Sequence, residues 1–109
     1  MEWRRKVKVY LSGSITKEPN YLVDFEVWEK RLKQRGYEVV NPASFPEVER
    51  YEDYMKRDIR LLLDCDAIFY VNDTTTSKGA FVEGLVAKVC GIRELTQSEV
   101  NLCGCSIGL

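Results

Sequence analysis

The sequence predicts a compact, doubly wound α/β domain, in which a parallel sheet of four to five strands carries helices on both faces. Two observations predict this fold class. Short β-branched segments alternate with segments of helical periodicity, which is typical of consecutive β-α-β units. The segment 67–71 is apolar throughout, as expected of a strand buried on both faces. The 109 residues suffice for one domain, which we place at residues 1–96, followed by a C-terminal tail at 97–109 of uncertain structure.

The first half of the chain contains two predicted strands and one helix. Residues 6–11 are rich in β-branched residues and alternate as a strand does. A helix follows, because apolar residues recur at helical spacing and Gly36 then provides a C-terminal cap. The apolar positions of this helix are Leu22, Phe25, Trp28 and Leu32. Residues 37–40 form the second strand, which Asn41 and Pro42 end.

The second half repeats the alternation. A second helix carries the apolar stripe Tyr51, Met55, Ile59 and Leu62. Residues 67–71 form the third strand, and a third helix runs from residue 79 to about residue 90, where Gly91 caps it. Residues 92–95 are expected to form a short fourth strand. The tail has a weak pattern that is compatible with a frayed end, a short helix or an arm on a neighbouring subunit.

The composition excludes several classes of protein. Sixteen Lys and Arg residues against 17 Asp and Glu residues give a net charge of −1, which argues against a dedicated nucleic-acid binder. We interpret the basic residues near the N-terminus as a solvated strand edge; they are Arg4, Arg5, Lys6 and Lys8. No apolar run approaches the roughly 18 residues of a membrane span. The N-terminus has no signal-peptide pattern, so we expect a cytoplasmic protein without membrane contact.

The chain has no histidine. This excludes a Ser-His-Asp triad, a Cys-His pair and imidazole acid–base catalysis, so any catalysis must use carboxylates, Tyr, Lys, Cys, Ser or backbone groups. Cys65 and Cys90 are expected to be reduced core residues. Only Cys103 and Cys105 approach metal-ligand spacing, and they lack a second pair. We therefore expect neither a metal nor a cofactor.

In a Rossmann-like or flavodoxin-like sheet, ligands bind beyond the carboxyl ends of the strands. Three predicted loops lie there, at residues 12–20, 41–50 and 72–79. The first begins with Ser12, Gly13 and Ser14, whose hydroxyl and backbone N–H groups can cradle an anion. The same composition is also common where a strand simply ends, so the motif alone does not establish phosphate binding.

The third loop leads into the third helix through Ser77, Lys78 and Gly79. Gly79 lets a ligand approach the backbone, and the helix N-terminus adds positive potential. Glu83 follows in about the first turn, on a side that we expect to face the strand ends. A simpler explanation is that an acidic residue in a first turn stabilises the helix dipole by about 0.3–1 kcal/mol.

Two further candidates are Asp58 and Tyr10. Asp58 lies beside the apolar stripe of the second helix, where a charge is usually a solvated boundary residue. Tyr10 lies late in the first strand, where an aromatic residue usually packs in the core. Each of these signals is weak by itself, and their combination is the informative feature.

That combination resembles the nucleoside 2-deoxyribosyltransferase superfamily, which includes the 2′-deoxynucleoside 5′-phosphate N-hydrolases. The similar segments are 9–15, 58–68 and 77–83. The chain looks most like a small bacterial and phage branch with the motifs Tyr-x-Ser-Gly, Asn-Pro, Cys-Asp-Ala-Ile and Ser-Lys-Gly-Ala-x-x-Glu, over residues 7–95. The resemblance implies a doubly wound α/β domain, usually a dimer or larger oligomer, that cleaves or exchanges the N-glycosidic bond between a base and a (deoxy)ribose.

The resemblance also implies roles for individual residues. Glu83 matches the nucleophile, Asp58 the carboxylate that protonates or positions the base, and Tyr10 the tyrosine that orients the nucleophile. Ser77 stands where transferases have an Asp and nucleotide hydrolases a Ser. Because a Ser does not repel a phosphate, we expect a nucleoside 5′-monophosphate as substrate, with Ser12, Gly13, Ser14, Ser77, Lys78 and Gly79 as its binding residues, and Lys17 or Lys78 as the cation.

The hypothesis is that two carboxylates and a tyrosine divide the chemistry without a histidine. Glu83 attacks the sugar, and water or a second base then releases it, so both hydrolysis and base exchange remain open. One alternative is a protein that binds or sequesters a nucleotide, or a nucleotide-derived signal, without turnover. Another is an interaction module with a vestigial pocket. The C-terminal part lacks the clear final strand and closing helix of longer relatives. Because a four-strand sheet is minimal, we expect a homo-oligomer whose interface covers the remaining apolar helix faces.

Overall fold

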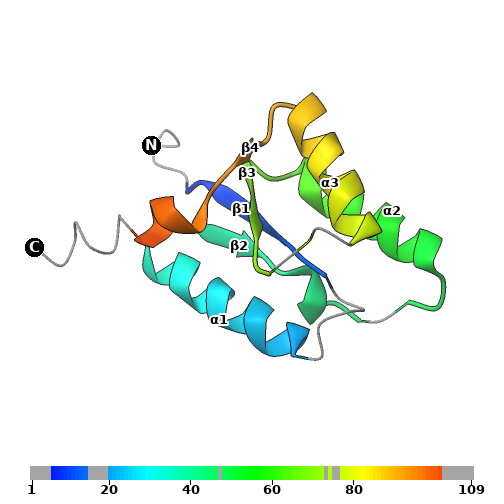
Figure 1. Ribbon diagram of the computed structural model, residues 1–109, viewed down its shortest axis with the longest axis horizontal. Helices are drawn as coiled ribbons and strands as arrows, with labels where there is room; N and C mark the ends of the chain where they lie inside the picture. The colour runs from blue at the N-terminus through cyan, green and yellow to red at the C-terminus, as the bar shows by residue number, and fades with distance from the viewer. Residues whose placement is uncertain (1–5, 15–19, 47, 73, 75–76, 102–109) are drawn as a thin grey trace, which may run out of the picture.

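The computed structural model describes residues 6–14, 20–46, 48–72, 74 and 77–101 (Figure 1). In chain order the elements are β1 (Lys8–Ser12), α1 (Tyr21–Gln34), β2 (Glu38–Val40), the 3-10 turn η2 (Pro42–Ser44), α2 (Tyr51–Leu63), β3 (Ala67–Tyr70), α3 (Lys78–Val89) and β4 (Arg93–Glu94). The predicted strands and helices are all present, with small shifts at their ends. None of the described helices has the length and apolar character that a membrane span requires.

Within the described residues, the strands form one parallel sheet in the order β2-β1-β3-β4. The central strand β1 pairs through Val9 with Val39 on one side and with Ala67 on the other. The chain leaves β1 toward β2 and returns to β3 on the opposite side, so the strand order reverses between β1 and β3. Ligands of doubly wound sheets bind at such a reversal. The order and the parallel pairing confirm the predicted fold class.

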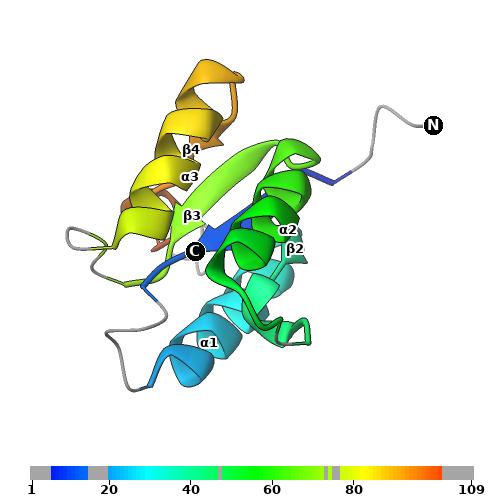
Figure 2. The same ribbon diagram turned by 90° about the vertical axis from the view of Figure 1, so that its right-hand side faces the viewer.

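The two faces of the sheet carry different helices. Val9 and Leu11 pack against Phe25 and Leu32 of α1, whereas Tyr10 packs with the cluster that includes Leu62 of α2 and Ala87 of α3. This division follows from the alternation of side chains along β1. Figures 1 and 2 show α1 on one side of the sheet and both α2 and α3 on the other. The carboxyl end of β1 therefore lies beneath two helices that can each contribute a side chain to one site.

Two helices end at the glycines that the sequence predicts. Gly36 follows the C-cap of α1 with a φ of 94°, and Gly91 follows the C-cap of α3 with a φ of 74°. Only glycine adopts this left-handed conformation without a steric penalty. Both turns direct the chain into the next strand, β2 or β4, and so set the length of the helix before it.

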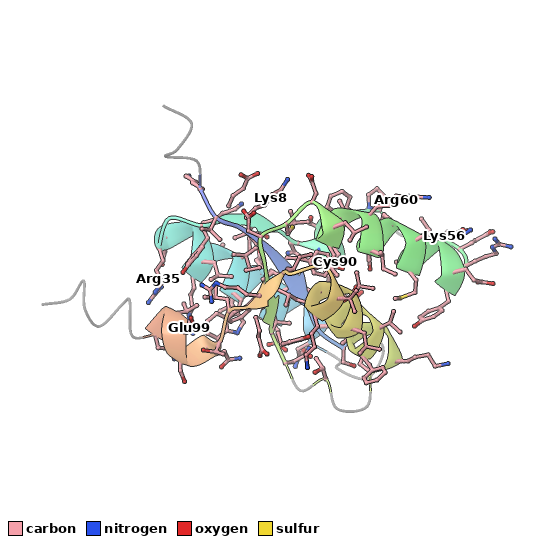
Figure 3. All side chains as sticks on the ribbon, turned by 90° about the horizontal axis from the view of Figure 1, so that it is seen from above. Lys8, Arg35, Lys56, Arg60, Cys90 and Glu99 are labelled. Carbon is pink, nitrogen blue, oxygen red and sulfur yellow. The ribbon has the colours of Figure 1, made fainter. Side chains whose placement is uncertain are left out.

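One alternative and one expectation from the sequence are wrong. The alternative that Asp58 is a solvated boundary residue fails, because only 5% of its surface is exposed. Cys90 is not a core residue; it is exposed at the C-cap of α3, where the helix has ended and the chain turns away (Figure 3). Cys65 is buried as expected.

The first part of the predicted tail is a short helix at residues 97–101. A capping box begins it, because the backbone N–H of Glu99 donates to Thr96 Oγ1 at 3.2 Å and the N–H of Thr96 donates to Glu99 Oε1 at 2.9 Å. Val100 is fully buried in the core on the α1 side. The boundary between residues 96 and 97 stays a prediction, and Cys103 and Cys105 lie outside the described residues.

Candidate active site

The carboxyl group of Glu83 is the centre of a buried hydrogen-bond network. The Tyr10 hydroxyl donates to Glu83 Oε2 at 2.7 Å, and the Ser12 hydroxyl donates to Glu83 Oε1 at 2.7 Å. All three side chains are buried, and Glu83 is 6% exposed. Because each carboxyl oxygen accepts a short hydrogen bond, the plane of the carboxyl group is fixed relative to β1.

The secondary structure explains how these three groups meet. Tyr10 and Ser12 are two residues apart in β1, so they point to the same face of the sheet. Glu83 shares the buried side of α3 with Ala80 and Ala87, whose small side chains let the helix lie close to the sheet. The helix begins at Lys78, so Glu83 lies in its second turn rather than its first. Its position therefore reflects the contact with β1 and not the helix dipole.

Burial governs the ionisation of this network. Burial raises the pKa of Glu83 to about 7, the hydrogen bonds from Ser12 and Tyr10 lower it, and the negative charge of Asp58 raises it. Burial, together with the nearby Glu83 and Asp58 carboxylates, also raises the pKa of Tyr10 far above its ordinary value. Tyr10 is therefore a neutral hydrogen-bond donor, while Glu83 exchanges its proton near neutral pH.

Asp58 is a second buried carboxyl group, which α2 contributes. Asp58 and Leu62 are one helical turn apart and form the buried side of α2. Burial raises the pKa of Asp58, and the adjacent Arg57 guanidinium, whose Nε donates to Asp58 Oδ1 at 3.0 Å, lowers it. The negative charge of Asp58 also raises the pKa values of both Glu83 and Tyr10.

The predicted loop after β1 is held by Asn72. The Ser14 N–H donates to Asn72 Oδ1 at 2.8 Å, and Asn72 Nδ2 donates to the Ser14 carbonyl at 3.2 Å. A Cβ atom on Gly13 would lie 2.7 Å from Val71 Cγ2, so this approach of the two strand ends requires glycine. Ser14 is 2% exposed, and its hydroxyl has no hydrogen-bond partner in the described part of the chain.

The predicted residues before α3 have a structural role as well. Ser77 is the N-cap of α3, and its hydroxyl accepts a hydrogen bond from the Ala80 N–H at 3.2 Å. Lys78 is exposed. A Cβ atom on Gly79 would lie 3.4 Å from Met55 Sδ of α2, which is an ordinary van der Waals distance. The contact between α2 and α3 therefore does not require glycine at this position.

A groove of about 970 Å³ runs along α3 on the side of β3 and β4. Its lining includes Ser77, Lys78, Tyr70, Phe81 and Gly84. Tyr10, Asp58 and Glu83 do not line it. The structure therefore brings Tyr10, Ser12 and Glu83 together, with Asp58 in electrostatic range. Ser77 and Lys78 lie apart from them, at the N-terminus of α3 and in the lining of the groove. Lys17 lies outside the described residues.

A protein-family model matches most of the chain. The model of a family described as a domain of unknown function, DUF4406, matches residues 7–95. The chain belongs to the DUF4406 family. The match spans the sheet, α1, α2 and α3, and thus every candidate site residue.

The DUF4406 domain shares its fold with a solved enzyme. A 2-deoxyribosyltransferase from the psychrotolerant bacterium Bacillus psychrosaccharolyticus superposes with a TM-score of 0.64 at 23% sequence identity. The alignment covers 83% of this chain and 71% of that chain. No curated protein matches the chain significantly. The likeness establishes the fold, which agrees with the resemblance noted in the sequence.

Three residues of the candidate site and its surroundings were missed by sequence reasoning. Arg57 binds Asp58, Asn72 binds the Ser14 backbone, and Tyr70 lies against α3 at Gly84, where a Cβ atom would be 2.6 Å from the Tyr70 hydroxyl. The sequence contains one signal for them, which is a glycine inside a helix, because such a glycine often marks a close approach. Arg57 and Asn72 are common surface residue types and give no signal.

In the described ranges of the DUF4406 domain, no group of three Cys, Asp or Glu residues is arranged to hold a metal ion. The expectation that the protein works without a metal or a cofactor stays a prediction. The chemistry available to the site is that of two buried carboxyl groups, a neutral phenol and a serine hydroxyl.

Proposed function

We propose that the protein cleaves or exchanges the N-glycosidic bond of a nucleoside 5′-monophosphate, with Glu83 as the nucleophile. One observation carries the proposal: Glu83 is a buried carboxyl group, held by Tyr10 and Ser12 where the strand order reverses, with Asp58 as a second carboxyl group nearby. The fold shared with a 2-deoxyribosyltransferase supports it. That enzyme is described as a biocatalyst for nucleoside synthesis.

The proposed reaction has two steps through oxocarbenium-like transition states. An oxygen of ionised Glu83 bonds to C1′ of the sugar as the C1′–N bond breaks, and the bonding electron pair leaves with the base. Asp58 donates a proton or a hydrogen bond to a nitrogen of the departing base. Water then attacks C1′, its proton passes to a carboxylate, and Glu83 is released. A second base in place of water gives exchange.

Tyr10 and Ser12 serve Glu83 in this proposal. Both donate to the carboxylate, so they stabilise its ionised form and hold its orientation. The single proton of the Ser12 hydroxyl is directed to Glu83, and the phosphate-binding role predicted for Ser12 stays a prediction. Removing the Tyr10 hydroxyl is expected to weaken the nucleophile by favouring protonated Glu83.

The phosphate is assigned to the N-terminus of α3 and the loop after β1. The Ser77 hydroxyl accepts from Ala80, so its proton remains for an acceptor such as a phosphate oxygen. Lys78 is an exposed cation at the same helix terminus. The backbone N–H groups of Gly13 and Gly79 and the hydroxyl of Ser14 are further candidate donors, because the Ser14 N–H already donates to Asn72. A neutral Ser77 accepts a 5′-phosphate that an Asp would repel.

A second copy of the chain is proposed to cover α3. Phe81, Leu85 and Val89 are spaced four residues apart, and 65%, 50% and 84% of their respective surfaces are exposed. Such a stripe on one helix is typical of an interaction surface. A homo-oligomer would bury it beside the N-terminus of α3, where the phosphate is assigned.

The proposal is tested with a panel of ribonucleoside and deoxyribonucleoside 5′-monophosphates and the matching nucleosides. Free base is measured by chromatography, with and without a second base. We expect base release from at least one monophosphate, faster than from its nucleoside, and a loss of at least about 10³-fold in Glu83→Gln. The matched control is Glu26→Gln, an exposed residue of α1.

Two outcomes contradict the proposal. Equal rates for Glu83→Gln and Glu26→Gln would remove Glu83 from the nucleophile role. Thermal stabilisation by monophosphates without release of base from any of them would instead identify a nucleotide-binding protein. If no member of the panel stabilises the protein or releases base, both functions are excluded.

A further inference from the structure

The guanidinium of Arg57 contacts three acceptor groups of the protein. Its Nε donates to Asp58 Oδ1 at 3.0 Å, and its Nη1 donates to the Pro46 carbonyl at 2.6 Å. Its Nη2 makes a longer contact of 3.4 Å with the Pro42 carbonyl. All three nitrogens of one guanidinium therefore face acceptors from α2 and from the segment 42–46 after β2.

Aromatic rings hold the same guanidinium in place. Its carbon lies 5.1 Å from the centroid of the Tyr54 ring and 5.6 Å from that of the Phe45 ring. Both distances are within the range of cation–π attraction. Only 21% of the Arg57 side chain is exposed. A lysine can supply the charge at this position, but not a planar group with three donors between two rings.

We propose that Arg57 is a positioning residue that joins the Asp58 carboxylate and the segment 42–46 into one rigid unit. The segment follows β2 at the carboxyl edge of the sheet, where the fold predicts ligand binding. Its anchoring would pre-form the side of the site that receives the base, opposite the nucleophile. The role in catalysis rests on the proposed function, whereas the anchoring of Asp58 and the segment does not.

The charges around Asp58 explain why it needs this partner. Arg57 faces it from α2, Glu83 from α3 and Tyr10 from β1. Of these, Arg57 favours the ionised carboxylate, whereas burial disfavours it. A buried carboxylate that loses its paired cation keeps its proton to higher pH. Loss of Arg57 is therefore expected to raise the pKa of Asp58.

The test compares Arg57→Gln and Arg57→Lys with the matched control Arg60→Gln. Arg60 is an exposed residue of the same helix, and Figure 3 shows its side chain pointing away from the sheet. Two measurements need no substrate: the pH titration of the Asp58 side-chain carboxyl by NMR, and amide hydrogen exchange of Ala43, Ser44 and Phe45. If Arg57→Gln does not fold, Arg57→Lys provides both measurements.

We expect Arg57→Gln to titrate Asp58 at higher pH than Arg60→Gln and to exchange the three amides at least about tenfold faster, because the local opening is no longer resisted. Arg57→Lys is expected to keep the Asp58 titration near that of the wild type while the amides still exchange faster. Unchanged titration and unchanged exchange in the Arg57 variants would overturn the proposal, whether or not the protein turns over any nucleotide.

If the protein turns over a nucleotide, the pH profile of kcat/KM distinguishes a positioning role of Arg57 from a purely structural one. The Asp58-dependent limb of kcat/KM is expected to move to higher pH in Arg57→Gln and to stay in place in Arg60→Gln. A purely structural role of Arg57 would lower the rate without moving the limb, and that result would refute positioning while leaving the proposed function intact.

Discussion

Glu83 carries its charge where water is excluded, and the residues around it only partly compensate. Burial raises its pKa to about 7, although Tyr10 and Ser12 both donate to it. A carboxyl group of this kind is ionised at and above neutral pH, without the stabilisation that solvent would give an exposed carboxylate. The same feature predicts a stability cost that can be measured without any substrate.

The stability of the protein is expected to depend on pH through Glu83. Its pKa is raised from 4.5 in the unfolded chain to about 7 in the folded one. Between these values the folded state holds a proton that the unfolded state has released, so stability is fully present below pH 4.5 and is lost as the pH rises through 7. A neutral residue at this position avoids the loss.

Glu83→Gln should therefore increase the free energy of unfolding at pH 8, by roughly 1–3 kcal/mol. At pH 5 wild-type Glu83 is largely protonated, and the two proteins should differ much less. Urea unfolding at both pH values measures the difference, with Glu26→Gln as the control. If Glu83→Gln is less stable than the wild type at pH 8, the ionised Glu83 carboxylate does not destabilise the folded state, which contradicts the prediction.

At the scale of single elements, α3 has three distinct features. Its buried side presents Glu83 to β1, its N-terminus carries Ser77 and Lys78, and its outer side exposes an apolar stripe. Gly84 follows Glu83 directly and makes room for Tyr70, whose hydroxyl would lie 2.6 Å from a Cβ atom. Glycine is unfavourable inside a helix, but at this position it allows α3 to lie close to Tyr70 of β3. The spacing between α3 and β3 also determines where Glu83 lies.

Gly84→Ala provides a test of this close approach. In an exposed helix this substitution stabilises by roughly 0.5–1 kcal/mol. Here we expect that gain to be reduced or lost, because the Tyr70 hydroxyl must shift to make room for the new methyl group. The double variant Gly84→Ala with Tyr70→Phe removes that hydroxyl and should recover the normal stabilisation relative to Tyr70→Phe alone. Additive effects of the two substitutions in urea unfolding would contradict the close approach.

At the scale of the whole molecule, the fold could be predicted because its determinants are local in the sequence. The alternation along β1, the stripes of α1 and α2, and the glycines at 36 and 91 specify strand, helix and turn within a few residues. The resemblance to a known superfamily drew attention to Tyr10, Asp58 and Glu83. The contact between Tyr10 and Glu83 spans 73 positions, and no periodicity indicates such a contact.

The parts of the site that were not predicted depend on tertiary contacts. The guanidinium of Arg57 is held beside Asp58 by contacts with the carbonyl groups of Pro42 and Pro46, which lie 15 and 11 positions earlier in the chain. The burial of Asp58, where the pattern indicated a solvated residue, comes from the packing of α2 beside α3. Cys90 was misplaced because the helix ends just before it. In each case the residue type is compatible with several environments, and only the packing selects one.

The assembly of the molecule is predicted from its exposed surface. Leu85→Glu places a charge in the middle of the apolar stripe on α3 and should convert an oligomer into a monomer, because burying an unpaired carboxylate costs more than the interface gains. Sedimentation velocity measures the change. The control is Leu22→Glu, an equally exposed position of α1, at 56% against 50%. A wild-type protein that sediments as a monomer, or equal effects of the two variants, would refute the role of α3.

The most direct test of the central claim is to trap the glycosyl ester on Glu83. A nucleoside 5′-monophosphate with fluorine at C2′ is suitable, because fluorine destabilises the oxocarbenium-like transition states and slows release of the sugar. After incubation, mass spectrometry of the intact protein and of its peptides locates any adduct. We expect one sugar phosphate, bonded to Glu83 and absent from Glu83→Gln. Turnover of natural monophosphates without an adduct, or an adduct on Asp58, would contradict it.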